Sequence, residues 1–261
     1  MILSSPRVAL VTGGTEGLGL ELVRKLAARG DRVFVVARHE HDLAGVAPSA
    51  RFIAADAGDP SFAEIVAAAL DRAGVDRLDL LIHNAADGWY GAPADMPPGR
   101  AESLLAVNTW ASLALTHRLA SRVLGQQGQR QPHGHVVFIG SIAAHLPAPR
   151  YAVYAASKAG LDGLARSLAA EWAGRATVQA IHPGPIATSF HARAGLRDVD
   201  TSRMPSAARV ATQVLARIEG RRWRAFTSRP IAAIALASRW FVGVIDVIAI
   251  SRERATRVKD G

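Results

Sequence analysis

A chain of 261 residues, of which 49% are hydrophobic and 20% charged, can bury one sizeable core and does not have the composition of a disordered protein. The absence of cysteine excludes disulfides, thiolate zinc sites and cysteine nucleophiles. The net charge of +9 is concentrated after Arg217, but no recognisable nucleic-acid-binding module accompanies it. We therefore expect one domain (residues 1–261), no nucleic-acid partner and no metal.

Short β-branched runs alternate with longer Ala- and Leu-rich stretches, which is typical of a parallel sheet with helices on both faces. We predict strands over residues 8–11, 32–37, 51–54, 78–82, 135–139 and 177–181. Between and after them we predict helices over residues 19–29, 60–73, 100–124, 153–172 and 206–218. The predicted fold class is α/β, a single-domain, doubly wound parallel sheet.

The first predicted strand runs directly into a glycine-rich turn, Thr12-Gly13-Gly14-Thr15-Glu16-Gly17-Leu18-Gly19, and then into a helix. Glycine there lets the backbone approach a pyrophosphate, which the first N–H groups of the helix can bind. Gly13 would form the turn, Gly17 would approach the phosphate, and Gly19 would pack the helix on the strand. The turn predicts a dinucleotide site that also includes Thr15, Glu16 and Leu18.

Tyr154 and Lys158 are four positions apart near the start of a predicted helix, so their side chains lie on one helix face. A phenol is a poor base at neutral pH, because its ordinary pKa is about 10. We expect the ammonium of Lys158 to lower the pKa of Tyr154. The pair therefore indicates proton transfer, and Ser141 lies near it at the end of a predicted strand.

These motifs resemble those of the short-chain dehydrogenase/reductase family. The turn is similar to its T-G-x-x-x-G-x-G loop, and Tyr154 with Lys158 is similar to its Y-x-x-x-K pair. The resemblance implies a Rossmann-type fold in which Ser141 binds the substrate carbonyl, Tyr154 transfers a proton and Lys158 binds the cofactor ribose. It also implies that Asn108 anchors a water that relays protons through Lys158, which completes the predicted catalytic set.

Three further segments extend the resemblance. Asp56-Ala57 resembles the segment with which the family contacts adenine. Asn84 resembles the inner asparagine of the family's N-N-A-G turn, from which His83 and Ala86 depart, and we interpret His83 as structural. The segment from 183 to 188 resembles the family's P-G-x-x-x-T turn, which implies that the nicotinamide is held by Pro183, Gly184, Ile186 and Thr188.

The residue after the second predicted strand bears on the choice between the two nicotinamide cofactors. Where the family often carries an acid for the ribose of NAD, this chain has Ala37 followed by Arg38, whose guanidinium can bind a 2′-phosphate. Glu16 would weaken that attraction unless it points to solvent or pairs with Arg38. NADP(H) is therefore favoured over NAD(H).

The resemblance implies an oxidoreductase that transfers a hydride between NADP(H) and a carbonyl or secondary alcohol. Two alternatives stay open. A relative on the same scaffold can reduce imines or catalyse epimerisation or elimination, and a non-catalytic protein can bind NADP without turnover. The presence of both Tyr154 and Lys158 argues against the last alternative.

The C-terminal part is less regular. Residues 189–205 follow the last predicted strand, where substrates bind in open α/β sheets, so we predict a substrate lid there. Residues 221–261 depart from the family as a basic and apolar extension. Within it, the apolar segment 231–250 is interrupted by Arg239 and Asp246, which disfavours a membrane span. We predict that it roofs a pocket for a hydrophobic substrate, packs on a partner or rests on a membrane surface.

Two expectations concern assembly and location. The resemblance implies a homodimer through the helices that begin near residues 100 and 153, whereas the divergent C-terminal part places a tetramer in doubt. The N-terminus has neither the basic flank nor the apolar run of a signal peptide, which favours a cytoplasmic location.

Overall fold

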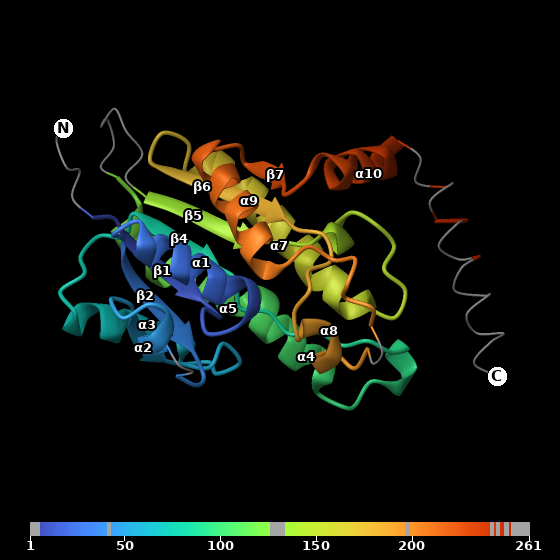
Figure 1. Ribbon diagram of the computed structural model, residues 1–261, viewed down its shortest axis with the longest axis horizontal. Coiled ribbons are helices and arrows are strands. Elements are labelled where there is room, and N and C mark those ends of the chain that lie inside the picture. Colours follow the sequence, from blue (N-terminus) through green and yellow to red (C-terminus); the bar gives the residue numbers. More distant parts are fainter. Residues whose placement is uncertain are drawn as a thin grey trace.

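The computed structural model describes residues 6–40, 43–125, 134–196 and 199–240, together with residues 243, 246, 247 and 251. In these residues seven parallel strands form one sheet in the order β3-β2-β1-β4-β5-β6-β7 (Figure 1). The strands are β1 (Val8–Thr12), β2 (Arg32–Ala37), β3 (Arg51–Ala54), β4 (Leu80–His83), β5 (Gly134–Ile139), β6 (Ala176–His182) and β7 (Arg224–Phe226). The predicted α/β fold class is confirmed.

Helices cover both faces of the sheet (Figure 1). One face carries α1 (Gly17–Ala28) and α9 (Ala207–Glu219), and the other carries α3 (Phe62–Arg72), α5 (Ala111–Arg118) and α7 (Ala152–Glu171). Successive residues of β1 supply both layers, because Leu10 packs in one hydrophobic core while Ala9 and Val11 pack in the other. The remaining α-helices of the described residues are α2 (Leu43–Val46), α4 (Arg100–Leu105), α6 (Ala120–Val123), α8 (Phe190–Arg193) and α10 (Arg229–Trp240).

The long helix predicted over residues 100–124 is not continuous. It is divided into α4, a π-helical turn at Ala106–Trp110, α5 and α6. The π turn contains Asn108, whose side chain is fully buried and hydrogen-bonded to other segments. Periodicity does not show such a turn, because the tertiary contacts of a single residue favour it.

Strand β7 was not predicted either. It has only three residues, Arg224 to Phe226, and no apolar run precedes it. It forms because β6 offers an open edge, along which Ala180, Ile181 and His182 pair with it in parallel. The sheet therefore ends one strand later than the sequence indicates.

The C-terminal helix α10 lies beside β7 at the edge of the sheet (Figure 1). Its first turn packs on the turn that follows β6, since a methyl group added to Gly184 would meet Ile231 Cδ1 at 2.5 Å. Farther along, Ile234, Leu236 and Trp240 are exposed. Within the described residues, no helix is long and apolar enough to cross a membrane. Most of the predicted apolar segment beyond Trp240 lies outside the described residues.

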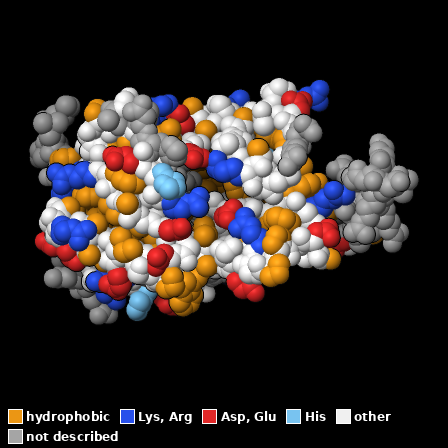
Figure 2. All heavy atoms as spheres, turned by 90° about the horizontal axis from the view of Figure 1, so that it is seen from below, with side chains coloured by type: hydrophobic (Ala, Val, Ile, Leu, Met, Phe, Trp, Pro, Cys, Tyr) orange, Lys and Arg blue, Asp and Glu red, His pale blue; other side chains and the backbone are white. Residues whose placement is uncertain are grey.

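The Lys and Arg side chains do not form a continuous positively charged patch on the face of the molecule seen in Figure 2. Lys and Arg side chains there are interspersed with Asp and Glu side chains and with apolar groups. This face therefore lacks the continuous stripe of positive charge with which proteins follow a nucleic-acid backbone.

Candidate functional site

A cavity of about 440 Å³ opens at the carboxyl ends of the strands, beside the neighbouring strands β1 and β4, where the strand order reverses. All the residues predicted to bind the cofactor line it: Gly13, Thr15, Glu16, Gly17, Leu18, Gly19, Arg38, Asp56, Ala57, Asn84, Tyr154, Lys158, Pro183, Gly184, Ile186 and Thr188. Ser141 also lines it, whereas the buried side chain of Asn108 does not. Segments distant in the sequence thus share one cavity.

The conformation of the glycine-rich turn is fixed by close packing against Ala85 and by hydrogen bonds from Asn84. Gly13 and Gly17 have φ values of 64° and 52°, a left-handed conformation that favours glycine. A methyl group on Gly13 would lie 2.8 Å from the Cα of Ala85, so the turn has no room for a side chain there. Asn84 closes the turn by donating from Nδ2 to the carbonyl oxygens of Thr12 (3.1 Å) and Gly13 (2.9 Å). Helix α1 therefore begins with its first N–H groups at the cavity.

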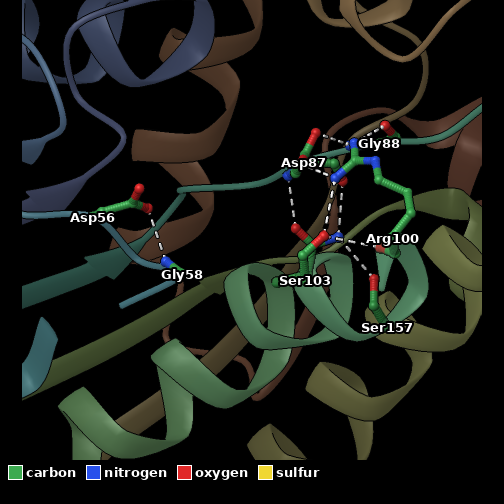
Figure 3. Close-up of polar contacts among 8 residues, drawn as sticks. Asp56, Gly58, Asp87, Gly88, Arg100, Ser103 and Ser157 are labelled. Carbon is green, nitrogen blue, oxygen red and sulfur yellow. Dashed lines mark hydrogen bonds and ion pairs between the residues drawn. The ribbon is translucent and has the colours of Figure 1, made fainter. Parts of the chain in front are cut away.

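The adenosine end of the cavity, expected at the ends of β2 and β3, has exposed charges. Arg38 is exposed on its rim, directly after β2. Asp56 follows β3, and its Oδ1 accepts a hydrogen bond of 2.8 Å from Gly58 N (Figure 3). Glu16 forms an ion pair with Arg193 of α8, which belongs to the predicted lid. The lid and the glycine-rich turn are therefore joined at the surface.

The opposite end contains Ser141, Tyr154 and Lys158. Ser141 stands between β5 and the 3₁₀ turn Ile142–Ala144, where its Oγ accepts from Ala143 N at 3.2 Å. Lys158 is buried, and its Nζ donates to the carbonyl oxygen of Ile139 at 3.0 Å and lies 5.8 Å from the ring centroid of Tyr154. The strand end and the helix α7 are thus held together beside the reacting groups.

The acid–base properties of this end differ from the sequence expectation. Burial raises the pKa of Tyr154 to about 12, although a hydrogen bond with the Ser141 side chain acts in the opposite direction. Burial also lowers the pKa of Lys158 to about 8. The expected lowering of the pKa of Tyr154 is therefore wrong for the protein alone, and the phenol stays protonated at neutral pH. In that form it is a proton donor.

Asn108 acts inside the fold through its buried side chain. Its Nδ2 donates to the carbonyl oxygen of Asp87 and to Ser157 Oγ, both at 2.9 Å, while its Oδ1 accepts from Asp87 N at 2.7 Å. Arg100 adds an ion pair to Asp87 and donates to the carbonyl oxygen of Gly88 at 2.8 Å. These bonds fix the chain that follows β4 against α7.

His83 is buried under the cavity floor. Its Nε2 lies 2.8 Å from Thr116 Oγ1, and its ring stacks on Phe138 with centroids 4.8 Å apart. Burial lowers the pKa of His83 to about 3, so the imidazole is neutral at physiological pH. These contacts support its interpretation as a structural residue.

Sequence reasoning missed the residues that form the apolar side of the cavity beside Tyr154. Ile142, Tyr151, Phe190 and His191 line it. The ring of Phe190 lies 5.4 Å from that of Tyr154, and the hydroxyl of Tyr151 lies 3.3 Å from His191 Nδ1. No motif marks these positions. The only signal was that residues 190 and 191 fall in the predicted lid.

A doubly wound parallel sheet with a glycine-rich turn at its switch point and a Ser, Tyr and Lys set in one cavity defines a dinucleotide-dependent oxidoreductase. A family model described as short chain dehydrogenase matches residues 7–197. The chain belongs to the short-chain dehydrogenase/reductase family, and it is a hydride-transferring enzyme of that family.

Individual relatives agree with this assignment. The chain is 30% identical over 220 residues to the 3-oxoacyl-(acyl-carrier-protein) reductase FabG of Escherichia coli, covering 80% of this chain and 88% of the relative. A solved short-chain dehydrogenase from Sphingobium yanoikuyae in complex with NADPH has a TM-score of 0.77 at 25% identity, over 96% of this chain and 95% of that chain. A Burkholderia phymatum structure in complex with NAD has a TM-score of 0.78 at 20% identity, over 94% and 96%, and shows the shared fold.

Proposed function

We propose that this enzyme transfers a hydride between NADP(H) and the carbonyl or secondary-alcohol carbon of a hydrophobic substrate. The observation that carries the proposal is the presence of Ser141, Tyr154 and Lys158 at one end of the cavity, with the glycine-rich turn and Arg38 elsewhere on its wall. The nicotinamide of the bound cofactor supplies or accepts the hydride. The residues of the chain position the reactants and move the proton.

The cavity suits a dinucleotide on two grounds. A methyl group on Gly13 would meet the backbone of Ala85, and one on Gly17 would lie 3.3 Å from Thr188. A side chain would be crowded at either position, and glycine there lets the backbone of the turn come close to a phosphate. Helix α1 also begins at Gly17, which directs unpaired N–H groups and the positive end of the helix dipole to the cavity. Both features bind an anion without a metal ion.

Each catalytic residue has a distinct part in the proposed reduction. Tyr154, whose pKa of about 12 keeps it protonated, donates its proton to the oxygen of the developing alkoxide. The Ser141 hydroxyl donates a hydrogen bond to the same oxygen. Lys158 holds the ribose and adds positive charge near the phenol. We further propose that Asn108 orders a proton-relay water through its main chain, because its side chain is already used by Asp87 and Ser157.

Two observations support NADP(H) rather than NAD(H). Arg38 is exposed on the cavity rim directly after β2, and no acid precedes it, since the neighbouring residue is Ala37. The ion pair with Arg193 balances part of the negative charge of Glu16. The solved relatives described above include one bound to NADPH and one bound to NAD, so the proposal depends on these residues.

The substrate is proposed to be hydrophobic because apolar and aromatic groups form the cavity wall beside Tyr154. Phe190 and Tyr151 lie against the tyrosine ring at centroid distances of 5.4 and 5.8 Å. Two of the wall residues, Phe190 and His191, come from α8, which supports residues 189–205 as the substrate lid. Within the described residues, none from α10 lines the cavity, so a roof formed by that helix is not part of the proposal.

Two proposed contacts involve the outer surface. Leu105, Trp110 and Leu113 are exposed apolar side chains on α4, the π turn and α5, which supports a homodimer through this region. Ile234, Leu236 and Trp240 on α10 are also exposed, and they support peripheral contact of a cytoplasmic protein with a membrane.

Ligand-dependent thermal unfolding tests the cofactor, and a panel of carbonyl substrates tests the reaction. NADPH is expected to raise the melting temperature more than NADH at equal concentration, because a ligand that binds the native state stabilises it by mass action. The protein is expected to oxidise NADPH in the presence of hydrophobic ketones or aldehydes. Binding of NADPH without turnover of any carbonyl or imine in the panel would instead support the non-catalytic alternative.

A further inference from the structure

A polar cluster lies behind the catalytic serine and outside the cavity wall. It consists of His182 at the end of β6, Asp162 on α7 and His145 after the 3₁₀ turn. His182 has no exposed surface, and none of the three lines the cavity. The assigned reaction makes no use of this cluster.

His182 connects two catalytic elements by hydrogen bonds. Its Nδ1 lies 3.1 Å from the carbonyl oxygen of Ser141, and its Nε2 lies 2.9 Å from Asp162 Oδ1. A carbonyl oxygen and a carboxylate only accept hydrogen bonds, so a ring nitrogen of His182 that bonds to either of them does so as an N–H donor. The carboxylate of Asp162 fixes the orientation of the imidazole ring. The ring in turn holds the carbonyl group of Ser141.

Neighbouring groups restrict the His182 ring on several sides. A methyl group on Gly140 would collide with His182 Nδ1, so the glycine before the catalytic serine makes room for the imidazole. The rings of His145 and Phe226 pack on the other sides, with centroids 4.5 and 5.3 Å from that of His182. The hydrogen bond to Ser141 is therefore made by a side chain with little rotational freedom.

Helix α7 holds the end of β5 at two carbonyl groups. Tyr154, Lys158 and Asp162 follow one another at intervals of four residues and share one helix face. Lys158 donates directly to the carbonyl oxygen of Ile139, and Asp162 reaches the carbonyl oxygen of Ser141 through His182. The residue after Ser141 is bonded to the turn that follows β6, because Ile142 N donates to the carbonyl oxygen of Pro183 at 3.0 Å.

We propose that Asp162 and His182 are a positioning pair that sets the place of the Ser141 hydroxyl relative to Tyr154 and to the turn that begins at Pro183. The pair touches neither substrate nor cofactor, so it acts through Ser141. The inference rests on the proposed function, since it names two more residues on which that reaction depends.

The same cluster has the donor set of a divalent-metal site, which gives a competing interpretation. The potential ligand atoms of His145, Asp162 and His182 lie within 4.8 Å of one another. The arrangement favours hydrogen bonding instead, because Asp162 Oδ1 already faces His182 Nε2 and the Arg224 guanidinium lies 4.0 Å from Asp162 Oδ2. A cation beside the carboxylate reduces the attraction that a metal ion would feel.

The test compares Asp162→Asn and His182→Asn with wild-type protein and with the exposed control Asp76→Asn. Asp162→Asn keeps the side-chain shape and removes the charge that holds the ring. Both variants at the pair are expected to lower kcat about 10- to 100-fold, because a small displacement of a reacting group costs that much. The Kd for NADPH and the KM for NADPH are expected to change less than about twofold, and the double variant should match the stronger single variant.

Readouts independent of turnover accompany the kinetics. NMR of histidine labelled with ¹⁵N is expected to show a hydrogen-bonded proton on the ring nitrogen of His182 that faces Asp162 in wild-type protein, and a weaker hydrogen bond there in Asp162→Asn. Thermal unfolding establishes whether the Asp162→Asn protein is folded, so that a lower kcat can be assigned to position rather than to unfolding.

Three results would overturn the proposal or its basis. Folded variants with wild-type kcat would reduce the pair to a structural contact. Stoichiometric zinc in the purified wild type, with activity lost to a chelator, would make His182 a metal ligand instead of a donor. A wild-type protein that turns over no substrate would contradict the proposed function and, with it, the positioning role. Wild-type turnover with unaffected variants would contradict the positioning role alone.

Discussion

The two ends of the cavity are built on different physical principles. At the nicotinamide end, Lys158 is buried and bonded to the backbone of β5, and Tyr154 has its pKa raised by burial. At the adenosine end, Glu16, Arg38 and Asp56 are exposed. Charges in water interact weakly, whereas buried groups are held by the whole fold. The proposed chemistry is therefore tied to the core of the protein, while the proposed choice of cofactor depends on a few surface charges.

The largest expected effect comes from removing the phenol at the buried end. Tyr154→Phe is expected to lower kcat by about 10²- to 10⁴-fold, because it deletes the proton donor and keeps the ring. The Kd for NADPH, measured by fluorescence titration, should stay within about twofold of the wild-type value. A variant that keeps most of its activity would show that another group donates the proton.

At the exposed end, Arg38→Gln should act on one cofactor only. Loss of a charge-assisted hydrogen bond to the 2′-phosphate costs about 1.5–3 kcal/mol, which weakens NADPH binding by roughly 10- to 100-fold. The Kd for NADH is expected to stay the same. Arg72→Gln, an exposed arginine at the end of α3, is the matched control. Equal weakening of both cofactors would contradict a phosphate contact.

A pH experiment tests whether His83 is buried as a neutral imidazole in the native protein. Burial lowers the pKa of His83 from 6.5 to about 3, so between those values the unfolded chain binds a proton that the native protein does not. His83 therefore lowers the free energy of unfolding as pH falls below 6.5, and its own contribution is roughly 1.4 kcal/mol for each pH unit until about pH 3.

His83→Asn removes this titration, so its stability is expected to decline less steeply in acid than that of wild-type protein. Urea unfolding at pH 7, 6, 5 and 4 measures the difference between the two slopes. His117→Asn, at an exposed position of α5, should keep the wild-type slope. Parallel slopes for His83→Asn and wild type would show that His83 is not buried in its neutral form.

The smallest expected effect concerns the ion pair between Glu16 and Arg193. Both side chains are about half exposed, so the pair itself contributes at most about 1 kcal/mol. Glu16→Gln removes a negative charge beside the expected 2′-phosphate and should tighten NADPH binding by about two- to fivefold, with less change for NADH. Titrations at low and high salt check the cause, because a charge effect shrinks at high salt. A salt-independent change would point to altered lid packing.

Much of this molecule could be predicted from the sequence, because continuous apolar runs and glycine-rich turns are local signals. Six of the seven strands were predicted, with boundaries that differ from the observed ones by at most two residues at each end. Strand β7 was missed because it forms only on the edge of β6. The π turn was missed because the buried contacts of Asn108 favour it.

In the candidate site too, some residues have a local sequence signal and others depend on contacts that only the folded chain makes. The residues of the ordered motifs were predicted to lie together, and all of them except the buried Asn108 line one cavity. Tyr151 and His191 were missed because only the folded chain brings them within 3.3 Å of each other. The pKa of Tyr154 was expected to fall because the charge of Lys158 was considered without the burial of both groups, and burial has the larger effect.

The regular spacing of Tyr154, Lys158 and Asp162 along α7 limits how this gene segment can change in length. An α-helix turns by about 100° for each residue, so one inserted or deleted residue between positions 154 and 162 would rotate the later side chains away from β5. Substitutions at the exposed positions of this helix leave that alignment intact. The segment is therefore a place where homologues can diverge in composition while their number of residues stays fixed.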